Sequence, residues 1–205
     1  MIIENYIIRN IWTSVIVLIL ISFSVGCGPV SSENESRIAI IRGKVSIPDV
    51  ESFVIDRFID NPYSIEQKRF STIVDSASEF YIEIPIECLS TGRISIGTFI
   101  NDLVLQSGDN IFLDIRPDTI IYSGRGAVKN LFLHELKSKN LDEGKISDLF
   151  NSHELSPASF LNQLQEIQEN QMQILKAYED DLNDEFINYF EIDSRVLHFM
   201  LLQNY

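Results

Sequence analysis

Apolar and polar residues alternate with a period of two between residues 37 and 123, and residues typical of turns interrupt the alternation. This period places successive side chains on opposite faces of a β-strand. In Glu79–Ile84, for example, Phe80, Ile82 and Ile84 share one face. The pattern predicts strands at Arg37–Val45, Ser52–Ile59, Lys68–Val74, Glu79–Ile84, Arg93–Ile100, Asp102–Leu105, Asn110–Ile115 and Thr119–Tyr122.

Strands that alternate in this way predict sheets with one face in water, which favours antiparallel pairing. Asp75–Ser78 is a hairpin turn signal, and Asn101-Asp102 is a second expected turn. Seven or eight short strands at such spacing are typical of a β-sandwich. We therefore expect an antiparallel β-sandwich over residues 37–123.

After Gly124 the period changes to 3.6, which predicts amphipathic helices. The first is expected at Ala127–Lys139. A second begins at Ser156-Pro157, a hydroxyl N-cap followed by proline at the first helical position. Their inward stripes are Val128, Leu131, Phe132 and Leu136 in the first, and in the second Phe160, Leu164, Ile167, Ile174 or Leu175, Tyr178 and Leu182, interrupted by Gln171.

A third helix, expected at Asp184–Gln203, is too apolar for a single buried stripe. It reaches the end of the sequence without a cap signal, and a partner surface would account for both features. Residues 124–205 thus form a segment of two to three helices that packs on the sandwich or on a partner. The predicted fold class is α+β, with the strands first and the helices after them.

The start of the chain carries a sixteen-residue uncharged run, Ile11–Gly26. It is shorter than a typical membrane-spanning helix but long enough for a secretory signal. The SVGC stretch that ends it resembles a bacterial lipobox, although Ser24 stands where leucine is usual. This resemblance implies that residues 1–26 are a lipoprotein signal peptide and that Cys27 is lipidated. An uncleaved membrane helix and an ordinary signal peptide remain alternatives.

The polar residues 27–36 predict a flexible tether between a membrane and the folded part. The net charge of −14 excludes nucleic acid as a typical partner. Residues 141–193 contain thirteen acidic residues against Lys145 and Lys176, a balance of −11. An acidic block of this kind is usually a solvated helical face, and a surface for a basic partner is the alternative. If Cys27 is lipidated, Cys88 is the one thiol left, and we expect it to be a small buried apolar residue.

Motifs for catalysis or cofactor binding are not evident in the sequence. His134, His153 and His198 have no partners at metal-ligand spacing, so exposed or helix-end histidines are expected. Gly124-Arg125-Gly126 precedes a helix and offers amides for an anion, but a strand-to-helix corner explains its glycines better. There is no CxxC and no GxSxG. The sequence therefore predicts a protein that is not an enzyme and has no cofactor.

Three segments resemble the N-terminal domain of Bacteroidota thiol-disulfide oxidoreductase lipoproteins of the TlpA/ResA-like type: Val74–Ile86, Leu105–Ile115 and Tyr122–Leu133. In that family a lipobox precedes a small β-sandwich of unknown function and a helical connector, which Phe186–Glu191 matches here. A thioredoxin domain follows in the family and is missing from this sequence. The resemblance implies a stand-alone relative, or a truncated or split oxidoreductase, with a thioredoxin-like protein as the expected partner.

The same resemblance implies possible envelope O-glycosylation, because Asp75-Ser76-Ala77 and Asp118-Thr119-Ile120 fit the motif used in that group of bacteria. Ser76 and Thr119 are the acceptor candidates, and both fall at expected turns or strand edges.

Three functions follow from these observations. The first is a non-catalytic lipoprotein of the bacterial cell envelope, anchored to the membrane through Cys27, that serves as a protein-interaction or accessory domain. The second is a glycan- or peptide-binding module of a surface uptake system, using aromatic residues on the wet sheet face such as Tyr63, Tyr81 or Phe112. The third is an envelope redox role, which requires an exposed Cys88 or a separate thioredoxin chain.

Overall fold

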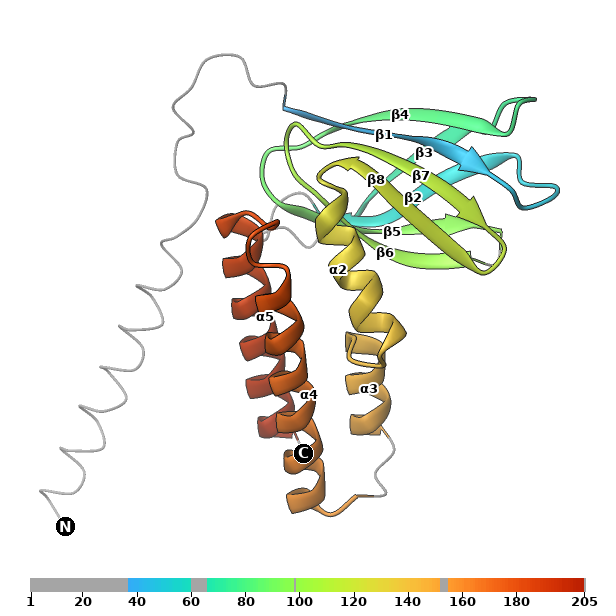
Figure 1. Cartoon of the computed structure of the whole chain (residues 1–205). Helices are drawn as coiled ribbons and strands as arrows, with labels where there is room; N and C mark the ends of the chain where they lie inside the picture. The colour runs from blue at the N-terminus through green and yellow to red at the C-terminus, as the bar shows by residue number, and fades with distance from the viewer. Residues whose placement is uncertain (1–36, 60–65, 98, 152–154, 205) are drawn as a thin grey trace, which may run out of the picture. The chain divides into compact units, whose positions relative to one another are not determined.

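The computed structural model describes residues 37–59, 66–97, 99–151 and 155–204, within one compact unit that spans Ser36–Tyr205. The expected signal peptide and tether, residues 1–36, lie outside the described residues. Strands come first and helices follow, as the periodicities predict (Figure 1). The elements are β1 (Ile38–Val45), β2 (Ser52–Ile59), β3 (Lys68–Ile73), β4 (Glu79–Pro85), β5 (Ser90–Ile96), β6 (Phe99–Leu105), β7 (Asn110–Arg116), β8 (Thr119–Arg125), α2 (Ala127–Ser138), α3 (Glu143–Asn151), α4 (Pro157–Ala177) and α5 (Asp184–Asn204).

The strands form two four-stranded sheets. Sheet A has the order β4-β1-β7-β8, and sheet B has the order β3-β2-β5-β6. The antiparallel prediction is confirmed for the other neighbouring pairs of the described strands, but β1 and β7 run parallel, with Ile41 opposite Ile111. The physical reason is that β7 reaches its place beside β1 by crossing over from the other sheet, a connection that alternation along a single strand does not reveal.

The core of the sandwich comes from the inward halves of the alternating strands. Ile41, Ile84 and Ile111 are fully buried, and they come from three adjacent strands of sheet A. Across the layer, the rings of Phe53 and Phe80 stack with centroids 4.1 Å apart. The two sheets are therefore held together by the apolar side chains that the period-two pattern marks.

The prediction of a turn at Asn101-Asp102 is wrong. Both residues lie inside β6, where Asn101 pairs with Ile94, and the chain reverses around Gly97 instead, at a φ of +56°. Asn101 is buried because its side-chain amide donates to the Oη of Tyr122 at 2.7 Å. A residue with a high turn propensity is thus kept in a strand by a tertiary hydrogen bond.

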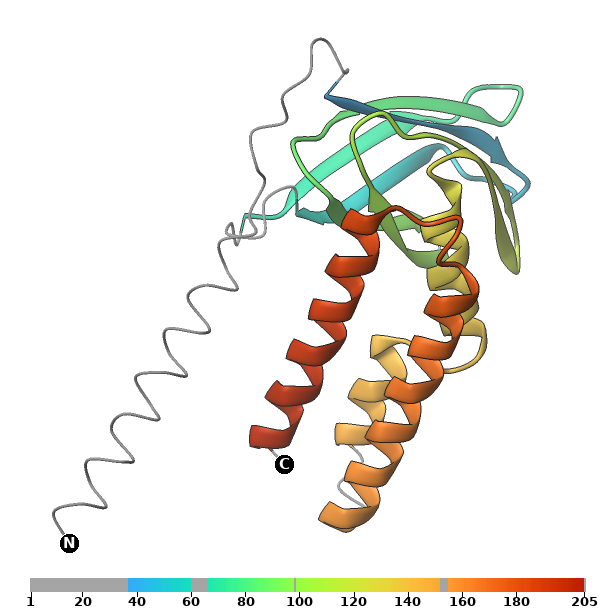
Figure 2. The same ribbon diagram turned by 60° about the vertical axis from the view of Figure 1, so that its left-hand side comes forward.

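The helices lie on one side of the sandwich, and α4 and α5 run antiparallel (Figures 1 and 2). Helix α2 packs against β6, β7 and β8 and so covers the edge where the two sheets end. Phe132 of α2 lies at the centre of the helical core, with its ring 4.7 Å from that of Phe190 and 5.7 Å from that of Phe186. This second core joins three helices to the sandwich through Val104 of β6.

Helix α2 also seals the edge of β6 with a polar side chain. Asn130 accepts a hydrogen bond from the Val104 amide at 2.8 Å and donates to the Val104 carbonyl at 2.9 Å. Asn130 is buried, whereas Leu131, which we expected on the inward stripe, is exposed. The face of α2 that packs on the sandwich therefore differs from the apolar stripe that we expected. It includes Asn130, which bonds to the sandwich, and excludes Leu131.

The start of α4 is confirmed: Ser156 is the N-cap, its hydroxyl accepts from the Ser159 amide at 3.2 Å, and Pro157 is the first helical residue. Helix α3 was missed because it is only nine residues long, about two and a half turns, too short for a sustained helical period. Its Ile146 and Leu149 pack in a small third core with Phe160. None of the helices in the described ranges has the length and apolar character needed to span a membrane.

Candidate functional site

Helix α5 has two faces that differ in their surroundings. Phe186 and Phe190 are buried in the helical core beneath the sandwich. On the opposite face, four large apolar side chains are between 48% and 59% exposed: Ile192, Val196, Phe199 and Met200. Their spacing of four, three and one residues places them on one stripe of the helix. We call these four residues the α5 apolar face.

Helix α5 has many apolar residues because it carries two apolar stripes, one buried in the helical core and one exposed. The prediction that this helix holds too much apolar surface for one buried stripe is confirmed. Ser194 marks the side of the helix that is turned to the protein, since its hydroxyl bonds to buried Gln171 of α4 at 3.1 Å. A helix that is tied down on one side and apolar on the other exposes a surface with the composition of an interface.

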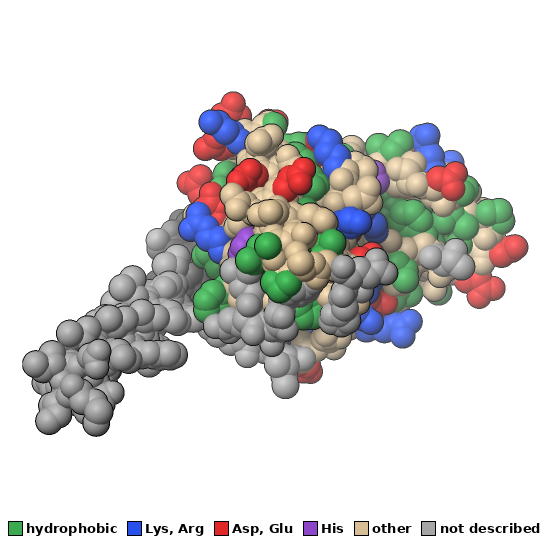
Figure 3. All heavy atoms as spheres, turned by 90° about the horizontal axis from the view of Figure 1, so that it is seen from below, with side chains coloured by type: hydrophobic (Ala, Val, Ile, Leu, Met, Phe, Trp, Pro, Cys, Tyr) green, Lys and Arg blue, Asp and Glu red, His purple; other side chains and the backbone are tan. Residues whose placement is uncertain are grey.

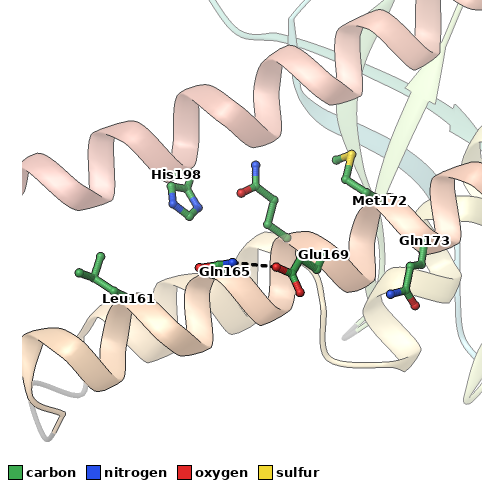
Figure 4. A pocket seen from close by; sticks show the side chains of 7 residues that line it. Leu161, Gln165, Glu169, Met172, Gln173 and His198 are labelled. Atoms are coloured by element: carbon green, nitrogen blue, oxygen red, sulfur yellow. Dashed lines mark hydrogen bonds between the residues drawn. The ribbon is translucent and has the colours of Figure 1, made fainter.

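A groove of about 750 Å³ runs between α4 and α5 (Figure 4). His198 of α5, next in sequence to Phe199, reaches into it from one wall. On the other wall, Gln165 donates to Glu169 at 2.8 Å (Figure 4). The groove also contains Leu161, Gln168, Met172 and Gln173. Its lining is mostly amide and apolar.

The surface around the groove and the α5 apolar face is acidic. Helix α5 carries four acidic residues and one arginine, and Arg195 is itself paired with Glu191 at 3.2 Å. Seen from below, hydrophobic side chains reach the surface between acidic and basic ones (Figure 3). A partner for this region would therefore combine apolar side chains with Lys or Arg.

Two carboxyl groups meet between α3 and α5. Although much of Glu143 is exposed, its carboxyl group is partly desolvated and shares a hydrogen bond with Asp193. Burial, followed by the charge of Asp193, raises the pKa of Glu143, and burial raises the pKa of Asp193. Burial also raises the pKa of the neighbouring Tyr189. The pair therefore keeps a proton to a higher pH than two separate carboxylates would.

The histidines do not gather into a site. His134 and His198 are half-buried rather than exposed, and the Nδ1 atom of each is buried without a hydrogen-bond partner. His153 lies outside the described residues. Within the described ranges, no three His, Cys, Asp or Glu side chains are grouped to hold a metal ion.

The Gly124–Gly126 stretch forms the strand-to-helix corner. Gly126 has a φ of +85°, and a Cβ there would lie 2.0 Å from the Oδ1 of Asp109. The side of Gly126 where a side chain would stand is thus occupied by the carboxylate of Asp109, and this negative charge beside the corner argues against an anion site. Burial raises the pKa of this Asp109.

A buried polar network at this corner was missed from the sequence. The Nζ of Lys129 donates to the Oε1 of Gln106 at 2.8 Å and to the Oδ1 of Asp109 at 3.0 Å. Gln106 in turn donates to Glu185, at the start of α5, at 2.7 Å. These groups are paired with one another, so the network holds the helices to the sandwich. The Gln106–Asp109 turn was visible in the sequence, but its buried partner Lys129 gave no signal.

The remaining predicted residues are dispersed. Ser76 is exposed in the turn between β3 and β4, and half-buried Thr119 begins β8, so both sit at turns or strand ends as expected. Cys27 lies outside the described residues, and Cys88 is half-buried rather than fully buried. None of the four lies close in sequence to the α5 apolar face.

Two of the aromatic residues that we expected on a solvent-exposed sheet face do lie on the same face of one sheet. Tyr81 on β4 and Phe112 on β7 are both exposed on the outer face of sheet A, on either side of β1. Tyr63 lies outside the described residues.

Comparison of the chain with protein-family models, with curated proteins and with solved structures found no match.

Proposed function

We propose that this chain is a non-catalytic lipoprotein of the bacterial cell envelope that is anchored through Cys27 and binds a partner protein with its C-terminal helix. The observation that carries the proposal is the α5 apolar face, where four large apolar side chains are about half exposed on a helix whose other side is packed. Apolar surface of this kind is stabilised when another surface covers it.

The chemistry of the partner follows from the surroundings of this face. The segment from residue 141 to 193 carries a balance of −11, which would repel a second copy of the same helix and an anionic bilayer. A partner with an apolar ridge flanked by Lys or Arg would cover the stripe and neutralise the acidic border. The resemblance to the leading domain of thiol-disulfide oxidoreductases suggests that this partner is a thioredoxin-like protein.

Membrane attachment rests on the SVGC stretch and the polar residues that follow it. Two or more acyl chains on a thiol give lasting attachment. A ten-residue tether would reach at most about 33–36 Å, so the folded part would stay close to the membrane.

A photo-crosslinking amino acid at position 196 of the full chain, introduced in the native host, tests the docking surface. We expect it to join the chain to one defined protein, and the substitutions Ile192→Ser and Phe199→Ser to abolish that product. The matched control is Ile73→Ser, at a side chain that is 79% exposed on β3. The purified partner should bind the full chain less tightly at 500 mM than at 50 mM NaCl. A product unaffected by the α5 substitutions, or binding insensitive to salt, contradicts the proposal.

Metabolic labelling with a clickable palmitate analogue tests the anchor separately. We expect label on the wild-type chain and none on the Cys27→Ala variant, with intact mass placing the lipid on residue 27. Label that persists in the variant, or an unmodified chain in membranes of the native host, contradicts lipidation but leaves the docking test standing.

A further inference from the structure

The outer face of sheet A carries a row of three side chains that are adjacent in register. Arg42 of β1 lies opposite Tyr81 of β4 on one side and opposite Phe112 of β7 on the other. Tyr81 is 51% exposed and Phe112 is 40% exposed. Because neighbouring strands are about 4.8 Å apart, the backbone positions of the two aromatic residues are separated by roughly 9.6 Å, with Arg42 between them in the sheet.

Tyr81 is held in place by its own strand. Its Oη donates to the Oε1 of Glu83 at 2.5 Å, and this hydrogen bond raises the pKa of the Tyr81 hydroxyl. A ring that is already oriented loses little conformational freedom when a ligand packs on it, which favours binding.

The guanidinium of Arg42 is not neutralised by the acidic groups on the neighbouring strands. Glu83 is engaged by Tyr81, and Asp114 is paired with Arg116 at 2.6 Å. The side chain of Arg42 forms no ion pair with a described residue, whereas Lys44 lies in register between Glu79 of β4 and Asp114 of β7. Arg42 is therefore a cation without an ion-pair partner among the described residues, at the centre of this face of a protein of net charge −14.

The position of the row in the sheet indicates the class of ligand. β1 and β7 are interior strands whose backbone groups are paired on both sides, so a peptide cannot add to them as a further strand. What this face offers is two ring surfaces and a guanidinium. A sugar ring can pack its C–H face on an aromatic ring, and a guanidinium can bind a carboxylate through two parallel hydrogen bonds.

We infer that the Tyr81–Arg42–Phe112 row binds an acidic carbohydrate chain, with sugar rings on the two aromatic side chains and a uronate carboxylate on Arg42. This site is on the sandwich and is independent of the docking surface on α5.

Calorimetric titration of the full chain in detergent with a hexasaccharide of galacturonic acid tests the inference. We expect saturable binding, weakened about tenfold or more by Arg42→Gln and also weakened by Tyr81→Ala and by Phe112→Ala. The control is Arg195→Gln, which removes an exposed arginine on α5 and should leave binding unchanged. Thermal unfolding of each variant establishes that it is folded.

Two further ligands separate the alternatives. A neutral maltohexaose should bind at least tenfold more weakly than the acidic hexasaccharide. A short poly-glutamate peptide should likewise bind weakly, since it has the charge but not the rings. Equal binding of the peptide, binding that Arg42→Gln leaves intact, or no saturable binding of the acidic sugar would each overturn the inference.

Discussion

The ammonium group of Lys129 lies 3.0 Å from the carboxylate of Asp109, and each side chain is more than 90% buried. Lys129 comes from the first turn of α2, and Asp109 from the turn before β7. The pair is extended by Gln106, which links it to Glu185 of α5. One buried polar network thus joins the sandwich, α2 and the start of the helix that we propose as the docking surface.

Removing one partner of this pair should destabilise the fold strongly. We expect Lys129→Met to lower the free energy of unfolding by about 3–5 kcal/mol, because it leaves a buried carboxylate without its cation. The double variant Lys129→Met with Asp109→Asn should be less destabilised than the single one. Urea unfolding measures both, and a loss below about 1 kcal/mol for the single variant would show that Asp109 does not depend on Lys129.

Asn130 should protect the edge of β6. In Asn130→Ala the amide and carbonyl of buried Val104 both lose their partner. We expect a loss of about 2–4 kcal/mol, since each unpaired buried backbone group costs about 1–3 kcal/mol. Hydrogen exchange should report faster exchange of the Val104 amide, while that of Ile111 in β7 serves as the internal reference. Unchanged protection of Val104 would speak against this role.

The two faces of α5 should respond differently to the same substitution. Phe186→Ala should cost about 3–5 kcal/mol, because Phe186 is fully buried in the aromatic cluster around Phe132. Phe199→Ala should change stability by no more than about 0.5 kcal/mol, as expected for an exposed position. Comparable losses in denaturant unfolding would mean that Phe199 contributes to the fold and would remove the basis of the docking surface.

The Glu143–Asp193 pair should make stability depend on pH. The folded-state pKa of both carboxyls is raised, so the stability they contribute is present below the ordinary carboxyl pKa of about 4. It is lost as the pH rises through the raised folded-state values. Burial dominates both shifts, and around Glu143 the acidic neighbours are Asp193 on α5, Asp102 on β6 and the adjacent Asp142.

Asp193→Asn removes one of these charges while keeping a group that can donate to Glu143. We expect the wild type to lose more unfolding free energy than this variant between pH 4.5 and 7.5, measured in urea. Asp148→Asn, at an exposed position of α3, is the control and should follow the wild type. Parallel curves for wild type and Asp193→Asn would rule out the pair as the source of the pH dependence.

Several elements could be predicted from the sequence because their causes are local. The Ser156-Pro157 start of α4 was predictable since the cap hydroxyl bonds an amide three residues away. The turn before β4 was predictable for the same reason: the carboxylate of Asp75 accepts from Ala77 at 2.9 Å and from Glu79 at 2.8 Å. The candidate site could be predicted only as an excess of apolar residues in the last helix.

The buried polar positions could not be predicted, because a polar side chain is buried only where a distant group satisfies it. Gln171 is buried since it donates to the Leu141 carbonyl at 2.6 Å, and Asn101 because it reaches Tyr122. The residues next to Gln171 and Asn101 in the sequence do not indicate which distant group each one bonds to.

The sequence alone determined the order of strands and helices, and which residues of each strand face the core. Hydrophobic period and turn chemistry act over a few neighbouring residues, so both can be read locally. The tertiary structure alone decided that β1 lies parallel to β7, which places Arg42 between Tyr81 and Phe112. It also decided which stripe of α5 is buried against α2 and which stays in water. Both outcomes depend on contacts between segments far apart in the chain, and these exist only once the sheets and helices have packed.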